Sequence, residues 1–280
     1  MVTGAKGMLG SDLCEVLSND FDVKGVDIDD FDIADEGATL NAIVGSGPDV
    51  VIHLAAYTDV EASEINPDKA FSVNAIGTLN VARAAREIDA YLVYLSTDYV
   101  FDGTKSQPYI EIDPINPISI YGLSKAYGEM YVSRVAKRNL IVRTSWLFGP
   151  NGINFVDKVI KQAESASQLR VVDDQRGCPT YTMHLALCLR EIIKQKIEGI
   201  LHIAGSGEAT WFELARTALD LAGIDVEVKP VTTDSYPARA KRPRYSVLSS
   251  MMLPRFGLKE LPAWEEGLKE HLRRKGKLKR

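Results

Sequence analysis

This sequence of 280 residues has few cysteines, no long apolar run and no excess of positive charge. Cys14, Cys178 and Cys188 are widely separated, and none belongs to a Cys-x-x-Cys or Cys/His pattern of a zinc site. We therefore expect no disulfide framework and no metal, and a cytoplasmic location is the default prediction. No stretch is long and apolar enough for a membrane span, and we expect no signal peptide before the first glycine loop.

Charge excludes a second group of functions. Lys and Arg number 33 and Asp and Glu 38, and the formal net charge of -5 gives no general attraction to nucleic acid. The exception is HLRRKGKLKR, residues 271–280, which we expect to be a solvated basic tail after a last helix. The sequence also lacks a P-loop lysine motif, which disfavours ATP chemistry.

Alternating strand and helix patterns fill the first half of the chain. Short, continuous apolar runs predict strands at 23–27, 49–54, 91–96 and 140–144, after a first strand of only three residues. Amphipathic periods between them predict helices at 9–17, 38–44, 68–88 and 121–137. Strands and helices that alternate at this spacing indicate a doubly wound parallel sheet of the Rossmann-like α/β class.

The second half has a looser pattern. It predicts helices at 154–164, 182–196, 210–222 and 263–272, a strand at 200–204, and a Pro-, Arg- and Tyr-rich stretch at 236–245. Thr210 or a neighbour is expected to cap the third of these helices. We predict a dinucleotide-binding domain at 1–150 and a smaller, mainly substrate-binding region at 151–280, with later segments returning to the sheet.

A glycine loop opens the chain. TGAKGMLG places Gly4, Gly7 and Gly10 between a strand and a helix, where backbone amides can approach a pyrophosphate. Asp27, at the end of the next strand, can accept hydrogen bonds from adenosine ribose hydroxyls, which favours NADH. Lys6 could instead meet a 2′-phosphate, so NADPH and NADH both stay open. The alternative is an ordinary glycine turn followed by an acidic turn residue.

Two later segments extend the predicted dinucleotide site. Asp32 and Ile33, in DFDIAD, are placed to flank an adenine. Ala55 and Ala56 follow the third strand and are small enough for a cofactor to pass close to the backbone. His53, at the end of that strand, is interpreted as a buried core histidine with satisfied hydrogen bonds.

YGLSK carries a tyrosine and a lysine one helical turn apart. Tyr121 and Lys125 share a helix face, and Thr97 and Asp98 follow a strand at the end where ligands of open α/β sheets bind. A fixed cation lowers the pKa of a nearby phenol from its usual value of about 10. The three side chains of Thr97, Tyr121 and Lys125 therefore predict an acid/base site for carbonyl reduction. The alternative is an amphipathic helix with a solvated lysine.

The order of these motifs resembles a known family. TGAKGMLG, HLAAYTDV, STDYVFDG and YGLSK are similar to the extended short-chain dehydrogenase/reductases. VRTSWLFG, DDQRGCPT and ARAKRPRYSVLS resemble one branch, the dTDP-4-dehydrorhamnose reductases. The resemblance covers nearly the whole chain, and it implies NAD(P)H-dependent reduction of the 4-keto group of dTDP-4-dehydro-L-rhamnose to dTDP-L-rhamnose.

By that resemblance, Thr97, Tyr121 and Lys125 carry catalysis, and Asp98 and Trp146 contact the sugar nucleotide. The implied cofactor contacts, besides Tyr121 and Lys125, are Gly4, Gly7, Met8, Leu9, Asp27, Asp32, Ala55, Ala56 and Tyr57. Arginines suited to the nucleotide phosphates are Arg176, Arg242 and Arg244, with surface salt bridges as the alternative.

The chain departs from the family at Asp12, where some members have a glutamate for a magnesium-bridged dimer. We therefore carry over neither metal nor dimer, and a monomer or a homodimer remains open. Two other functions also remain open: a related sugar-nucleotide 4-reductase or epimerase, and a non-catalytic subunit similar to the regulatory subunit of methionine adenosyltransferase.

Overall fold

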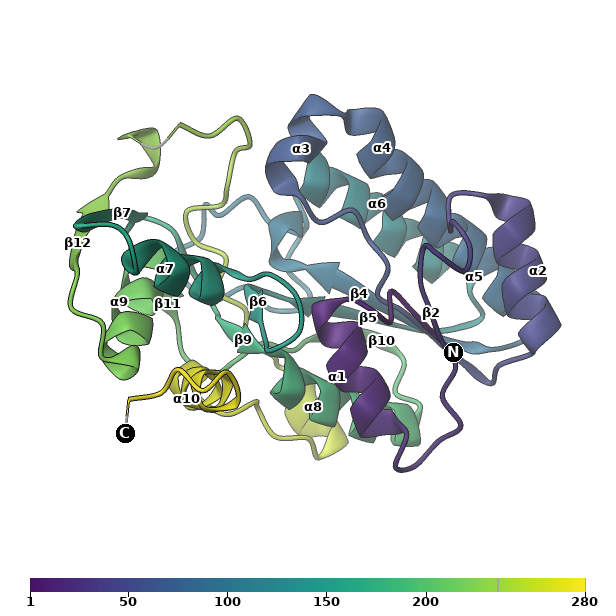
Figure 1. Cartoon of the computed structure of the whole chain (residues 1–280). Coiled ribbons are helices and arrows are strands. Elements are labelled where there is room, and N and C mark those ends of the chain that lie inside the picture. The colour runs from purple at the N-terminus through teal and green to yellow at the C-terminus, as the bar shows by residue number, and fades with distance from the viewer. Residues whose placement is uncertain (236, 280) are drawn as a thin grey trace.

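A parallel sheet of six strands forms the centre of the molecule in the computed structural model, which describes residues 1–235 and 237–279 (Figure 1). Its order is β10-β5-β4-β3-β1-β2, and every neighbouring pair is parallel. The strands are β1 (Val2–Thr3), β2 (Gly25–Val26), β3 (Val50–His53), β4 (Tyr91–Thr97), β5 (Arg138–Thr144) and β10 (Gly199–His202). The predicted parallel α/β sheet is confirmed, although β2 is shorter than the sequence pattern indicates.

Helices cover both faces of this sheet, because successive strand residues point to opposite sides. Tyr91 and Val93 pack into one apolar cluster, beneath α1 (Met8–Leu17) and α8 (Thr182–Gln195). Leu92 and Tyr94 pack into a second cluster on the other face, beneath three helices. These are α2 (Glu36–Ser46), α5 (Thr78–Glu87) and α6 (Ile120–Val135). Figure 1 shows the two groups of helices on opposite sides of the strands.

The predicted helix at 68–88 is interrupted by a wider turn. It consists of α4 (Pro67–Phe71), a π-helix η1 (Ser72–Gly77) and then α5. A short helix α3 (Val60–Ile65), which the sequence pattern did not predict, precedes α4. A π-helical turn inserts one residue into the helical period and often marks a functional site.

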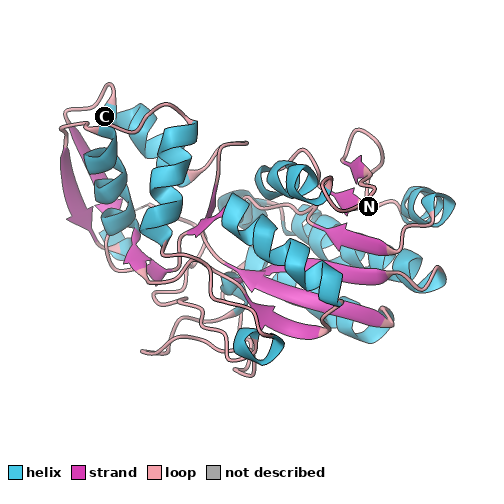
Figure 2. Cartoon of the chain, turned by 90° about the horizontal axis from the view of Figure 1, so that it is seen from below, coloured by secondary structure: helices cyan, strands magenta, loops and turns pink. Residues whose placement is uncertain are grey.

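A second lobe of α7 (Phe155–Ala163), α9 (Trp211–Ala222) and α10 (Trp264–Arg274) lies beside the sheet (Figure 2). These three helices share a third apolar cluster. The strands β7 (Gln168–Val172) and β12 (Glu227–Val231) pair in parallel at its edge. Shorter pairs join β6 (Leu147–Phe148) to β9 (Thr180–Tyr181) and β8 (Arg176–Gly177) to β11 (Ala209–Thr210).

Thr210 caps α9 as predicted. Its hydroxyl accepts a hydrogen bond from the Glu213 amide at 3.1 Å, and the Glu213 carboxylate accepts one from the Thr210 amide at 2.7 Å. This reciprocal capping box satisfies two of the amides that a helix start leaves without partners.

The C-terminal basic segment continues from α10 along the second lobe. His271 and Leu272 are buried, so the predicted solvated tail is wrong for these two residues, whereas residues 273–277 and 279 are exposed. The His271 ring is buried and lies 2.9 Å from an Asp157 oxygen. Lys277 forms an ion pair with Glu164 at 3.0 Å, and the Lys279 amide donates to the Leu221 carbonyl at 2.9 Å. Residue 280, and residue 236 of the Pro-, Arg- and Tyr-rich stretch, lie outside the described residues. No helix within 1–235 and 237–279 has both the length and the apolar character that crossing a membrane requires.

Candidate active site

A cleft of about 990 Å³ lies at the carboxyl ends of the central strands. It brings together most of the residues that the sequence predicted for cofactor, catalysis and substrate. These are Gly4, Gly7, Met8, Leu9, Asp27, Asp32, Ile33, Ala55, Ala56, Tyr57, Thr97, Asp98, Tyr121, Lys125 and Trp146. Arg176, Arg242 and Arg244 are not part of the cleft wall.

The glycine loop is shaped by two close backbone approaches. Gly4 has a φ of +73°, and a Cβ at this position would lie 2.7 Å from the Ala55 amide nitrogen. A Cβ at Gly10 would lie 2.1 Å from the Gly4 carbonyl oxygen. At Gly7, the N-cap of α1, no side chain binds the free amides of the first turn. The loop is therefore a backbone cradle at a helix N-terminus, which fits a dinucleotide pyrophosphate.

Asp27 lies at the end of β2, at the mouth of this cradle. One carboxylate oxygen accepts the Lys6 amide at 2.8 Å, and the other accepts the Ile28 amide at 2.9 Å. The Lys6 ammonium forms an exposed ion pair with Asp29 at 2.6 Å. Both of the groups that could select between the two dinucleotides, the Asp27 carboxylate and the Lys6 cation, therefore lie at the same rim of the cleft.

The first turn of α6 holds Tyr121. The Ser119 hydroxyl caps the helix by accepting a hydrogen bond from the Gly122 amide at 3.1 Å. Gly122 packs directly against the chain after β4, where a Cβ would lie 2.2 Å from the Tyr99 carbonyl oxygen. The Tyr121 ring meets the Tyr99 ring edge-on at 5.7 Å and is 9% exposed. The phenol is thus held in the cleft wall by the close approach of two backbones.

Two hydroxyls bind the Asp98 carboxylate beside the phenol. The Thr97 hydroxyl donates to it at 3.0 Å and accepts the Tyr99 amide at 3.2 Å. The Ser246 hydroxyl donates to the other oxygen of Asp98 at 2.6 Å. Burial raises the pKa of Asp98 to about 7, although both hydroxyls oppose the shift. Ser246 was not singled out from the sequence, although it belongs to the RPRYS segment that carries two predicted arginines.

The pKa of Tyr121 differs from the sequence prediction. Burial raises the pKa of the phenol above its usual value, and the Asp98 charge raises it further, while the neighbouring Thr97 hydroxyl opposes the shift. Lys125 does not lower it. The sequence prediction considered only the ammonium group and not the loss of water around the phenol, which has the larger effect here.

Lys125 lies one turn below Tyr121 and is 4% exposed. Its ammonium nitrogen is 4.2 Å from the centre of the Tyr94 ring. Burial lowers the pKa of Lys125 to about 7, and the charge of Glu129 opposes the shift. His53, on β3, is buried and lies 2.8 Å from the Thr3 hydroxyl and 3.1 Å from the Thr78 hydroxyl, in agreement with its interpretation as a core histidine.

Asn74, in the π-helix, supports the cleft wall from behind and was not singled out from the sequence. Its amide oxygen accepts the Tyr57 amide at 2.7 Å, and its amide nitrogen donates to the Ser124 hydroxyl at 2.9 Å. One buried side chain therefore connects the loop after β3 to α6. The local sequence does not indicate these contacts, because Asn74 has the pattern of an ordinary polar residue in a helix.

An aromatic stack forms the other wall of the cleft. Trp146 has a φ of +46°, which is rare for a bulky residue and indicates strain at a functional position. Its ring stacks on Trp211 at 3.6 Å with an angle of 6° between the planes. A Cβ at Gly177 would lie 2.4 Å from the Trp146 ring, so only glycine leaves room for it. Trp211 also lines the cleft and was not predicted from the sequence.

The three predicted phosphate-binding arginines form ion pairs with carboxylates. Arg176 pairs with Glu208 at 3.2 Å, and Arg242 pairs with Glu61 at 2.7 Å. Arg244 pairs with Asp174 at 3.3 Å and with Asp234 at 3.2 Å.

Asp12 is buried in a structural contact. Its carboxylate accepts hydrogen bonds from the Thr182 hydroxyl and, at 3.0 Å, from the Asn151 amide. Burial raises its pKa, against the effect of these bonds and of Arg274. Within the described part of the chain, no group of three or more His, Cys, Asp and Glu side chains could hold a metal ion.

A glycine cradle, a buried tyrosine and lysine on one helix and a hydroxyl at the neighbouring strand end together define a dinucleotide-dependent oxidoreductase of the short-chain dehydrogenase/reductase type. Comparison with known proteins agrees. The model of the RmlD substrate binding domain matches residues 1–276. The spore coat polysaccharide biosynthesis protein SpsK of Bacillus subtilis is 39% identical over 273 residues, which cover 97% of this chain and 96% of the relative.

Two further proteins carry a more specific name. A dTDP-4-dehydrorhamnose reductase of Sinorhizobium fredii is 36% identical over 277 residues, covering 95% of this chain and 93% of the relative. The crystal structure of dTDP-4-dehydrorhamnose reductase from Bacillus anthracis, in complex with NADP, has a TM-score of 0.95 at 39% identity, with 98% of each chain covered. The chain belongs to the dTDP-4-dehydrorhamnose reductase family.

Proposed function

We propose that the chain reduces the 4-keto group of dTDP-4-dehydro-L-rhamnose to give dTDP-L-rhamnose, with NADPH or NADH as reductant. The observation that carries this proposal is the placement of Thr97, Tyr121 and Lys125 in the same cleft as the glycine cradle. The first half of the chain, residues 1–150, supplies that cradle and the catalytic helix. Residues 151–280 contribute Gly152, Ile153 and Trp211 to the cleft wall and are proposed to bind mainly the sugar nucleotide.

The reduced dinucleotide, when bound, supplies a hydride to the carbonyl carbon. Tyr121 donates its proton to the carbonyl oxygen, so that one hydride and one proton complete the reduction. A raised pKa keeps the phenol protonated, as a proton donor requires. Solvent then restores the proton to the tyrosinate that remains. The Lys125 ammonium is placed to hold the nicotinamide ribose. Thr97 orients the carbonyl oxygen toward the phenol.

Binding of the sugar nucleotide is proposed to involve the other wall. The stacked Trp146 and Trp211 rings present an apolar surface to the cleft, and Asp98 is the polar group beside Thr97. The side chains of Arg176, Arg242 and Arg244 are 40%, 24% and 59% exposed, so each could exchange a carboxylate for a phosphate. Planar guanidinium groups suit such bidentate contacts.

An absorbance assay at the nicotinamide band tests the function directly. With dTDP-4-dehydro-L-rhamnose, we expect NADPH or NADH to be oxidised in proportion to the sugar nucleotide added, with both dinucleotides assayed in parallel. Release of oxidised dinucleotide at each turnover distinguishes a reductase from an epimerase that retains its cofactor. Absence of turnover, together with recovery of a synthetase partner in a pull-down, would instead support a regulatory subunit.

We predict that Asp27→Ala weakens NADH binding more than NADPH binding. The carboxylate at the end of β2 is the group placed to accept bonds from an unphosphorylated ribose, and a 2′-phosphate would be repelled by it. Dissociation constants of both dinucleotides, measured by fluorescence for the wild type and the variant, give the comparison. Equal weakening of both would show that Asp27 only braces the Lys6 and Ile28 amides.

A further inference from the structure

Glu129 lies one further turn along α6 from Lys125, and its carboxylate is fixed by three buried contacts. Ser96 donates to one oxygen at 2.5 Å, and Arg143 Nε donates to the same oxygen at 2.9 Å. Arg143 Nη2 donates to the second oxygen at 2.7 Å. The side chains of Glu129 and Arg143 are 5% and 4% exposed, so water does not screen this ion pair.

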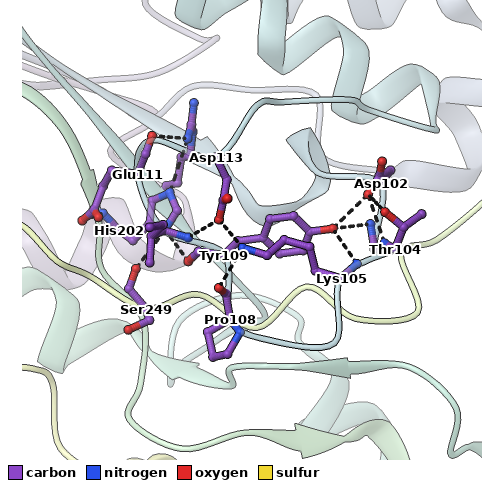
Figure 3. Close-up of polar contacts among 12 residues, drawn as sticks. Asp102, Thr104, Lys105, Pro108, Tyr109, Glu111, Asp113, His202 and Ser249 are labelled. Carbon is purple, nitrogen blue, oxygen red and sulfur yellow. Dashed lines mark hydrogen bonds and ion pairs between the residues drawn. The ribbon is translucent and has the colours of Figure 1, made fainter.

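Arg143 is held from its far side by groups without charge. Its Nη1 lies 3.3 Å from His202 Nε2 and 3.5 Å from the Glu111 carbonyl oxygen. Because arginine can only donate, His202 Nε2 must accept, so the ring proton lies on Nδ1. Figure 3 shows that nitrogen bonded to the carbonyls of Tyr109 and Ser249, at 3.0 and 3.2 Å. Burial and the Arg143 charge lower the pKa of His202 to about 4, so the ring is neutral.

The far end of this network is anchored as well. The Glu111 carboxylate accepts the His202 amide and the Met251 amide, both at 3.1 Å, and also the Ser250 hydroxyl. The chain around Tyr109 is braced by its phenol, which donates to Asp102 at 2.9 Å (Figure 3). Glu129 therefore cannot move toward or away from Lys125 without disturbing contacts that extend to the loop at residues 102–113.

The surroundings of Lys125 contain few groups that can balance its charge. Titratable or charged groups on the elements that pack around it are His53 of β3, Lys69 of α4, Tyr94 of β4, Asp98 and Tyr99 of η2 (Asp98–Val100), Arg143 of β5, and Tyr121 and Glu129 of α6. His53 is neutral, since burial and the Lys125 charge lower its pKa to about 3. The Asp98 carboxyl is occupied by Thr97 and Ser246. The Lys125 ammonium lies over Tyr94 and the Glu129 carboxylate accepts from Ser96, two residues further along the same face of β4. This places a buried carboxylate beside the ammonium, and its charge favours the ammonium form.

We infer that Glu129 is a positioning residue for the reduction: held by Ser96 and Arg143 outside the cleft wall, it favours the charged form of the Lys125 side chain. This inference rests on the proposed function of Lys125 in the same cleft. Reduction requires a charged Lys125, so activity falls at high pH when the ammonium loses its proton. Removing the Glu129 charge makes that loss occur at lower pH.

The pH profile of kcat/KM for Glu129→Gln tests the inference. We expect the alkaline fall in activity to move down by about one pH unit, so that the variant is about tenfold slower than the wild type at the alkaline end of the profile. At pH 6 the two should agree within about twofold. The matched control is Glu164→Gln, which removes the charge of an exposed carboxylate on the second lobe, and its profile should coincide with that of the wild type. An unshifted profile of folded Glu129→Gln overturns the inference.

Glu129→Gln leaves Arg143 buried without its partner, which can prevent folding. The double variant Glu129→Gln/Arg143→Gln removes both charges of the buried ion pair, so no unpaired arginine is left. It still lacks the carboxylate beside Lys125. We expect the alkaline fall in kcat/KM of the double variant to move to lower pH as well, by a smaller amount than in Glu129→Gln. If the folded double variant shows no such movement, the inference is overturned.

A binding measurement separates this inference from the proposed function. The dissociation constant of NADPH is measured against pH by fluorescence for the wild type and Glu129→Gln, without any sugar nucleotide. As the pH is raised, the affinity of the variant for NADPH should begin to weaken at a pH about one unit lower than in the wild type. If the wild type reduces no sugar nucleotide but this shift occurs, the proposed function fails and the inference stands. If the wild type reduces the sugar nucleotide but neither the kcat/KM profile nor the NADPH-binding profile of the variant shifts, the inference alone fails.

Discussion

Tyr121→Phe is expected to lower kcat for sugar-nucleotide reduction by about 10²–10⁴-fold, the usual contribution of a positioned general acid. Phenylalanine keeps the ring that packs edge-on against Tyr99 at 5.7 Å, so the cleft retains its shape. Dissociation constants for the dinucleotide should therefore stay within about threefold of the wild type. The measurement combines steady-state kinetics with fluorescence binding of NADPH.

The control for this experiment is Tyr127→Phe, on the same helix. Tyr127 is 41% exposed and is not part of the cleft wall, so the loss of its hydroxyl should leave kcat unchanged. If Tyr121→Phe reduces the substrate as fast as the wild type does, the phenol is not the proton donor.

Gly122→Ala is expected to lower kcat by about 100-fold or more, without removing any catalytic group. The new methyl group would lie 2.2 Å from the Tyr99 carbonyl oxygen and 3.0 Å from its carbonyl carbon. Both atoms belong to the backbone, so the first turn of α6 must move, and Tyr121 moves with it. A displacement of about 1 Å at a catalytic group is sufficient for a loss of this size. Steady-state kinetics and a thermal melt measure the two consequences, and the melting temperature should also fall.

Gly45→Ala provides the matched control, because Gly45 lies in helix α2 and nothing lies within 4 Å of an added Cβ. That substitution should stabilise the helix by roughly 0.5–1 kcal/mol and leave kcat unchanged. Unaltered kinetics in Gly122→Ala would show that the approach of α6 to Tyr99 does not set the position of the phenol.

Local sequence patterns were sufficient for the parts of the structure that depend on local chemistry. The continuous apolar run at β4 predicts a buried strand, and the glycine loop predicts a cradle at a helix N-terminus. Tyr121 and Lys125 could be placed on one helix face from their spacing alone. Residues that lie in the same cleft because parallel strands end together, such as Gly4 and Thr97, could also be grouped in advance.

Residues whose roles depend on distant partners could not be predicted. Asn74 bonds Ser124 across 50 positions, and Ser246 bonds Asp98 across 148. In each pair, the residues around one partner give no indication of where the other partner lies. The burial of His271 was missed for the same reason, since its partner Asp157 lies on α7, 114 positions away.

The π-helix η1 holds one residue more than an α-helix of the same length would. Its wider turn carries Asn74, whose side chain reaches both the Tyr57 amide and the Ser124 hydroxyl. Removing one residue between Ser72 and Gly77 would restore an ordinary α-helical turn, so α5 would keep its packing on the sheet while the contacts of Asn74 would be lost. The segment can therefore lose the connection between the loop after β3 and α6 without losing the fold.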